Sequence, residues 1–167
     1  MTERWEIEEI PEKVEKLLEV LLQSAVLESD ARLKLATPVD TGRLRANWFI
    51  GEGTDPRVKA GKEGQKYSDT SPINVVTDPS TKALNISRTG PKGTNYRPGN
   101  EKLDKFYSIT NSMEYAEPVC YGTGLPASWG GSYKTKQGAV AGFPELIAKG
   151  MQKYIDYNWE KFVRETN

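Results

Sequence analysis

The stretch that decides the fold is PEKVEKLLEVLLQSAVLESDARLKL, residues 11–35. Its apolar residues recur at spacings of three and four, so they share one face of a helix. Charged and amide residues between Glu12 and Gln23 fill the other face. Pro11 suits the first turn of a helix, and Pro38 ends it because the residue before a proline avoids the helical region. The pattern predicts one long amphipathic helix. Its apolar stripe is Val14, Leu17, Leu18, Leu21, Leu22, Ala25 and Val26.

The next segment, Pro38-Val39-Asp40-Thr41-Gly42, has the composition of a turn. The Asp40 carboxylate can accept hydrogen bonds from the backbone two residues on, and Gly42 can take a positive φ. After this turn, apolar and polar residues alternate over residues 43–50, which predicts a strand with one buried face. The apolar positions are Leu44, Ala46, Trp48 and Ile50.

Further strand candidates follow, separated by polar segments. They are residues 73–77, 83–87 and 106–111, and a turn at Asp78-Pro79-Ser80 divides the first two. Residues 113–121 are ambiguous and are expected to form a helical turn closed by Gly122. Long polar loops rich in Gly, Pro and Lys are expected at about residues 51–72, 88–104 and 124–142.

The last periodic segment predicts a second amphipathic helix over residues 144–163. Helix, antiparallel strands and helix in this order predict an α+β fold, in which an antiparallel sheet packs against a long N-terminal helix and a C-terminal helix. We expect one domain over residues 1–167. The stripe of the second helix is Leu146, Ile147, Met151, Tyr154, Ile155, Trp159, Phe162 and Val163. The aromatic residues expected in the core are Trp48, Phe106, Tyr154, Trp159 and Phe162.

Charge is balanced overall and uneven along the chain. Twenty-three basic and 23 acidic residues give a net charge of zero, which disfavours a uniformly basic nucleic-acid binder. Residues 1–30 are nevertheless acidic, whereas residues 31–142 are basic. Two interpretations stay open: the two regions steer identical subunits toward one another, or the acidic region is a solvated helix face.

The chemical inventory is small. The chain has one cysteine, Cys120, and no histidine. An internal disulfide, a zinc site of Cys and His, and a Ser-His-Asp or Cys-His mechanism are therefore excluded within one chain. No run of about 20 apolar residues is present, so we expect no membrane span. The first residues do not resemble a signal peptide, and we expect a protein made and kept in a cytoplasm, with no cofactor.

Three enzymatic or ligand-binding alternatives are weak. Asp40-Thr41-Gly42 spells the catalytic triplet of aspartic proteases, but a helix precedes it and bulky residues follow it. The glycine-rich segments Gly122-Thr123-Gly124 and Gly130-Gly131-Ser132 lack the spacing of a phosphate-binding loop. Scattered carboxylates lack the spacing of metal ligands and fit a solvated surface better. These carboxylates belong to Asp69, Asp78, Glu101, Asp104 and Glu114.

Residues 36–45, ATPVDTGRLR, and residues 115–123, YAEPVCYGT, are the two most distinctive segments of the chain. The first resembles the opening motif aPvDTGrLr and the second resembles the later motif YA.yvEyGT of one known family, the neck, tail-completion or minor tail proteins of long-tailed phages. Gly142-Phe143-Pro144 fits a third segment loosely. Cys120 departs from the family pattern, which usually has an acid there. The matching residues are Pro38, Asp40, Thr41, Gly42, Arg43, Leu44, Tyr115, Ala116, Tyr121, Gly122 and Thr123.

The resemblance implies a structural virion protein and not an enzyme. Such proteins join the head connector or stopper to the tail terminator or tail tube. The resemblance also implies a ring of identical subunits, sixfold in expectation, enclosing the channel that double-stranded DNA crosses. The expected location is the virion neck or tail, after assembly in the host cytoplasm. The runner-up is a small nucleic-acid-binding module without catalysis.

Exposed loops supply candidate interface or lumen residues. Trp5, Trp129 and Tyr133 stand in polar surroundings, which suits anchors for a protein partner. Basic side chains facing a lumen would screen passing phosphates without reading sequence, although plain solvation is the simpler interpretation. The candidate lysines are Lys134 and Lys136 on one loop, and Lys59, Lys62 and Lys66 on another.

Overall fold

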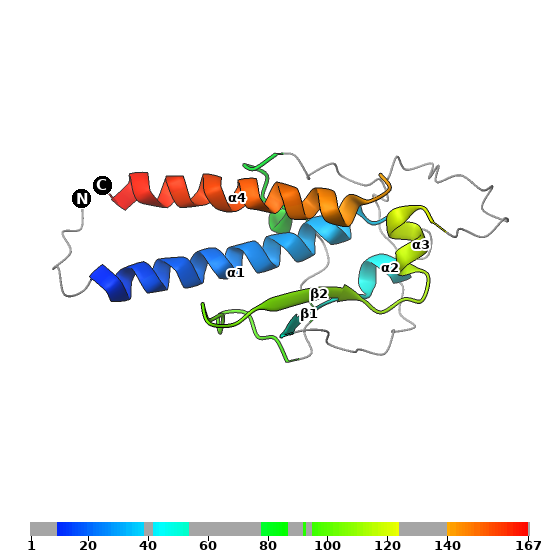
Figure 1. Ribbon diagram of the computed structural model, residues 1–167, viewed down its shortest axis with the longest axis horizontal. Coiled ribbons are helices and arrows are strands. Elements are labelled where there is room, and N and C mark those ends of the chain that lie inside the picture. Colours follow the sequence, from blue (N-terminus) through cyan, green and yellow to red (C-terminus); the bar gives the residue numbers. More distant parts are fainter. Residues whose placement is uncertain are drawn as a thin grey trace.

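The structure is a computed structural model that describes residues 10–38, 42–53, 78–86, 92, 95–123 and 140–166. Two long helices, α1 (Ile10–Ala36) and α4 (Phe143–Thr166), extend side by side, and a two-stranded sheet lies on the other side of α1 (Figure 1). Short helices α2 (Arg43–Ala46), η2 (Ala83–Asn85) and α3 (Ala116–Tyr121) complete the described elements. The predicted α+β fold, an antiparallel sheet with a long N-terminal helix and a C-terminal helix, is confirmed.

The sheet is an antiparallel pair of β1 (Trp48–Glu52) and β2 (Tyr107–Asn111). Trp48 pairs with Asn111, and Ile50 pairs with Ile109. The other edge of β1 makes a backbone hydrogen bond to Lys92, in which the Ile50 N–H donates to the Lys92 carbonyl at 2.8 Å. The predicted strand at residues 106–111 is confirmed to within one residue, whereas residues 73–77 lie outside the described part of the chain.

Helix α1 is the centre of the molecule and contacts α2, α4, η2 and both strands. Its predicted bounds differ from the observed ones by one residue at each end. The main core lies between α1 and α4. The hydroxyl groups of Tyr154 on α4 and Ser24 on α1 also share a 2.7 Å hydrogen bond. Burial of each large side chain there contributes about 1.5–3 kcal/mol. The core members are Ala25, Leu33, Ala36, Trp48, Cys120, Phe143, Ile147, Met151 and Tyr154.

The strand expected over residues 43–50 is wrong in its first half. Residues Arg43–Ala46 form a helical turn, α2, and the strand begins only at Trp48. Gly42 has φ 81° and its carbonyl accepts the Ala46 N–H at 2.9 Å, so the chain turns into a helix directly after the left-handed residue. All four alternating apolar residues are still buried, because the turn packs against the end of α1.

The strand expected over residues 83–87 is also wrong, since Ala83–Asn85 form the 3-10 helix η2. The cause is a carboxylate from another element. The two Oε atoms of Glu28 accept the Ala83 and Leu84 backbone N–H groups at 2.6 and 3.1 Å. A helical turn presents its first N–H groups in one direction, as this carboxylate requires.

The aromatic core is smaller than predicted. Trp48 and Tyr154 are buried as expected, and Trp159 and Phe162 are only half-buried. Phe106 is 63% exposed, so its expected place in the core is wrong. Tyr107 and Ile109 pack against the buried cluster, and side chains alternate across a strand, so Phe106 projects from the opposite face. In the α4 stripe, Leu146 and Val163 are likewise exposed.

Candidate functional site

Arg45 from the first motif closes the C-terminal end of α1. Its guanidinium is buried and donates from Nε and Nη2 to the Thr37 carbonyl at 3.2 and 2.7 Å, and from Nη2 to the Leu35 carbonyl at 3.4 Å. The last carbonyls of a helix lack partners within the helix, and a cation near them is favoured by the helix dipole. Arg45 therefore has a structural role at this junction.

Thr37 fixes the start of β1 to the same helix end. The Trp48 indole Nε1–H donates to Thr37 Oγ1 at 2.9 Å, and that hydroxyl donates to the Leu33 carbonyl at 2.6 Å. All three side chains are buried. This chain of bonds aligns the indole beside α1, where it forms part of the core.

The two motifs of the resemblance meet in space. Leu44 from the first packs against Ala116 and Val119 from the second in one buried cluster. The Asn111 amide at the end of β2, four residues before the second motif, donates to the Leu44 carbonyl at 2.8 Å. Pro38 and Gly42 lie at the same junction, whereas Asp40 and Thr41 lie outside the described residues. The Arg43 side chain is exposed.

The second motif forms α3 and ends as predicted. Gly122 has φ 69°, and its N–H donates to the Pro118 carbonyl at 2.8 Å. The Cys120 carbonyl accepts the Gly142 N–H at 2.7 Å, which ties the end of α3 to the start of α4. Tyr115, Tyr121 and Thr123 are exposed and Ala116 is buried.

Two ionisable side chains of α3 stay protonated at neutral pH. The Tyr121 hydroxyl donates to Glu145 Oε1 at 2.8 Å, and this bond raises the pKa of Tyr121 to about 12. Burial raises the pKa of the Cys120 thiol to about 12. A thiol reacts as its thiolate, so Cys120 is not poised as a nucleophile.

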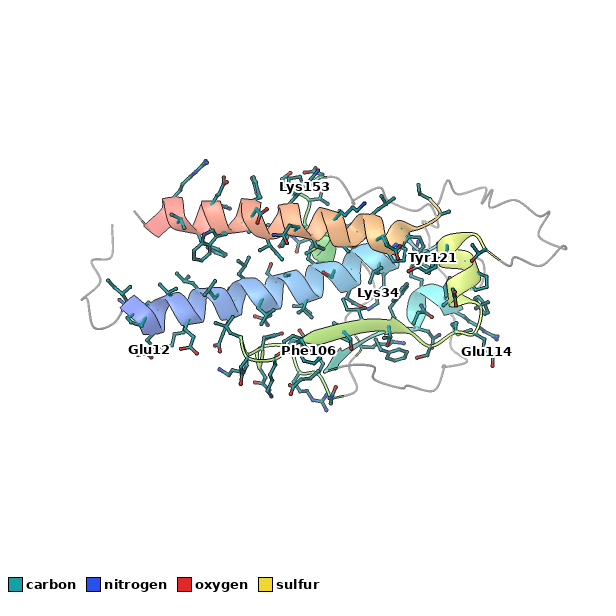
Figure 2. The ribbon with its side chains drawn as sticks, in the orientation of Figure 1. Glu12, Lys34, Phe106, Glu114, Tyr121 and Lys153 are labelled. Atoms are coloured by element: carbon teal, nitrogen blue, oxygen red, sulfur yellow. The ribbon has the colours of Figure 1, made fainter. Side chains whose placement is uncertain are left out.

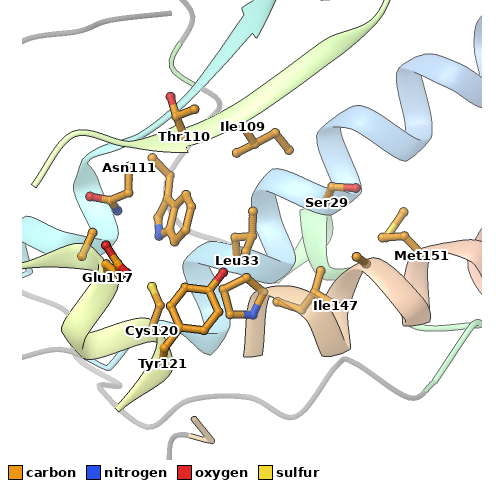
Figure 3. A pocket seen from close by; sticks show the side chains of 14 residues that line it. Ser29, Leu33, Ile109, Thr110, Asn111, Glu117, Cys120, Tyr121, Ile147 and Met151 are labelled. Carbon is orange, nitrogen blue, oxygen red and sulfur yellow. The ribbon is translucent and has the colours of Figure 1, made fainter. Parts of the chain in front are cut away.

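These elements enclose an open groove of about 920 Å³ between α1, the sheet, α3 and α4 (Figure 3). Its apolar lining includes Leu33, Ile109, Ile147 and Met151, and Glu117 is the one charged residue among the fourteen that line it. Figure 3 shows Glu117, Cys120 and Tyr121 together at the α3 end. The volume falls in the range of about 300–1,000 Å³ that suits a bound molecule or an inserted side chain.

Several residues that the sequence offered as site candidates have roles in local structure, and others lie outside the described residues. Asp78 Oδ1 accepts the Ser80 N–H and hydroxyl, and Glu101 accepts from Tyr96 and from the Gly99 N–H. Within the described ranges, no three His, Cys, Asp or Glu side chains gather as a metal site. The candidates outside the described residues are Trp5, Trp129, Tyr133, Lys134, Lys136, Lys59, Lys62, Lys66 and Asp69.

Sequence reasoning missed four buried charged residues in α1. Glu28 binds Arg32 at 3.0 Å and Asp30 binds Lys34 at 2.6 Å, with all four side chains at most 2% exposed. Two of these acids belong to the N-terminal region whose charges fitted a solvated face, so that interpretation is wrong for them. The only sequence signal is the spacing of four, which surface pairs share.

No family model, curated protein or solved structure matches this chain. In the part of the chain that the structure describes, no helix has both the length and the apolar character needed to cross a membrane.

Proposed function

We propose that this protein is a structural virion protein of a tailed bacteriophage, a neck or tail-completion subunit that joins the head connector to the tail. We expect six identical subunits to form a ring around the DNA channel. Its partners are connector or stopper proteins on the head side and tail terminator or tail tube proteins on the other. The working location is the virion, after assembly in the host cytoplasm.

The observation that carries the proposal is the contact between the two motifs. Leu44 packs on Ala116 and Val119, although the segments are far apart in the sequence. Two unrelated chance matches have no reason to share one buried cluster, whereas two parts of one family pattern do. This contact supports the resemblance on which the functional proposal depends.

The use of the motif residues also supports a structural role. Arg45 caps α1, Gly42 and Gly122 supply left-handed turns, and Leu44 fills the core. These residues hold α1, the sheet and α3 in fixed positions around the groove. A subunit without catalytic activity that connects two assemblies must keep its shape. The junction of α1, the sheet and α3 would give it that rigidity.

The test is electron microscopy of lysates from phage that lack this gene. We expect filled heads and free tails that remain unjoined, and rescue when the wild-type gene is supplied on a plasmid. Intact, joined virions in the deletion lysate would overturn the proposal. In that case salt-sensitive DNA binding by the purified protein would favour a nucleic-acid-binding module.

A matched pair of variants connects the lysate to the structure. Leu44→Asp places a charge in the cluster shared by the motifs and should abolish rescue, since an unpaired buried charge is costly. Arg43→Asp changes the exposed neighbour in the same turn and should leave the fold intact. Circular dichroism of both purified variants would separate loss of fold from loss of joining.

A further inference from the structure

The groove between α3 and the start of α4 has an acidic rim. Glu117 lines the groove. Glu145, in the first turn of α4, accepts a hydrogen bond from the hydroxyl of Tyr121, which also lines the groove. Glu114 lies just before α3 (Figure 2) and is not one of the groove residues, but residues 112–123 contain no lysine or arginine that would offset the charge of Glu117. The groove therefore combines an apolar floor with negative charge at one end.

The same chain carries a segment of complementary chemistry. Residues 124–139, GLPASWGGSYKTKQGA, contain two aromatic residues, two lysines and no acid. Large aromatic side chains supply most of the energy at protein interfaces when they fill an apolar pocket. Lysines beside them would meet the carboxylates at the rim and fix the orientation of the contact. The aromatic and basic members are Trp129, Tyr133, Lys134 and Lys136.

We infer that the groove is the docking site for residues 124–139 of a second copy of this chain. A groove on one subunit and an inserted segment on the next make a heterologous contact, and this kind of contact closes rings when it repeats around an axis. Each copy then gives one segment and receives one. The inference rests on the proposed function, because it names the contact that would join neighbours in the ring.

The first experiment measures self-association of the purified full chain by sedimentation velocity. We expect association that weakens at least about tenfold in Trp129→Ala, as for the loss of an interface anchor. Phe106→Ala is the matched control, because it removes an exposed aromatic side chain that does not line the groove, and it should associate as the wild type does. A wild type that stays monomeric at every concentration reached, or a Trp129→Ala variant that associates normally, would overturn the inference.

A charge exchange tests the rim without touching the core. Glu117→Lys should weaken association, and so should the double change Lys134→Glu with Lys136→Glu. The three changes together should restore most of the affinity, because the attractive pairs are rebuilt with their signs reversed. Additive loss in the combined variant would contradict the contact. Glu117 is exposed and outside the buried clusters, so the fold should survive.

A cross-link identifies which copy occupies the groove. In a Cys120→Ala background, one chain carries Ala148→Cys in the groove wall and a differently tagged chain carries Ser128→Cys beside Trp129. Oxidation of the mixture should give a product with both tags. A bond that forms only when both cysteines are in one chain would overturn the inference in favour of the chain's own segment. Because these assays use purified protein, their failure leaves head–tail joining to be judged from the lysates.

Discussion

The two halves of α1 carry the same kind of ion pair in opposite surroundings. In the first half, Lys16 binds Glu12 at 2.8 Å, with their side chains 68% and 72% exposed. In the second half, Arg32 binds Glu28 at 3.0 Å and both side chains are at most 2% exposed. Each pair has an acid four residues before a base, so spacing alone does not distinguish them.

The difference teaches what the burial of an ion pair requires. The exposed pair exchanges water for a weak, screened attraction and contributes little. The buried pair must have its remaining hydrogen-bonding groups satisfied. Glu28 accepts two backbone N–H groups of η2, and Arg32 donates to the carbonyls of Asp78 and Thr81 at 3.1 and 3.0 Å. The Arg32 guanidinium also lies 5.2 Å from the centre of the Tyr154 ring. The pair therefore joins residues 78–84 and α4 to α1.

The second buried pair is less well satisfied. Lys34 donates to Asp30 Oδ2 at 2.6 Å, but Asp30 Oδ1 is buried without a hydrogen bond. Burial outweighs the attraction of the lysine and raises the pKa of Asp30 to about 6, and burial also lowers the pKa of Lys34. Both shifts favour the neutral forms of this pair.

The largest effect should come from Glu28→Ala. The change leaves the Arg32 charge and two backbone N–H groups buried without the carboxylate, and we expect a loss of about 3–5 kcal/mol in the free energy of unfolding. Urea denaturation followed by circular dichroism measures it. A loss comparable to that of a surface substitution would show that η2 is not held by this carboxylate.

The next effect is a pH dependence carried by Asp30. The folded pKa is raised from 3.8 to about 6, so the folded protein keeps a proton there that the unfolded chain loses. The stabilisation is complete below the unfolded pKa and is lost as the pH rises through about 6, by up to about 3 kcal/mol. Stability relative to Asp30→Asn should therefore fall over this range. If the free energies of unfolding of the wild type and Asp30→Asn change in parallel with pH, the raised pKa of Asp30 is contradicted.

A smaller effect is expected where the buried half of α1 ends. Thr37→Val keeps the shape of the side chain but leaves the buried Trp48 indole N–H without its acceptor, which should cost about 1–3 kcal/mol. Ser29→Ala is the control, because its hydroxyl only donates to the Ala25 carbonyl within the same helix. Equal losses in thermal unfolding of the two variants would mean that the indole bond has no special weight.

The smallest effect should come from Glu12→Ala in the exposed half. Its carboxylate is exposed to solvent, and its partner among the described residues is the equally exposed Lys16, so the melting temperature should match that of the wild type within measurement error. A clear decrease in the melting temperature would show that the exposed ion pair also stabilises the fold, and the two halves of α1 would then not differ as described.

Much of the fold could be predicted from local patterns. Periodicity gave α1 and α4 to within one residue at the start of each, and Gly42 and Gly122 were correctly expected in turns. Arg45 was not recognised as a helix cap, because its partners depend on the α2 turn that replaced the expected strand. At the candidate site, the resemblance locates both motifs, but it does not predict the groove that the second motif lines.

The sequence by itself determined which segments are helical and which face of each is apolar, because these properties depend on neighbours three and four residues away. Only the tertiary structure decided that most of the second half of α1 is buried, including every residue from Asp30 to Ala36. That burial requires residues 78–86, the sheet and α4 to pack around the same helix. Contacts between segments so far apart in the chain leave no periodic signal, and they turn ordinary-looking ion pairs into the buried connections of the core.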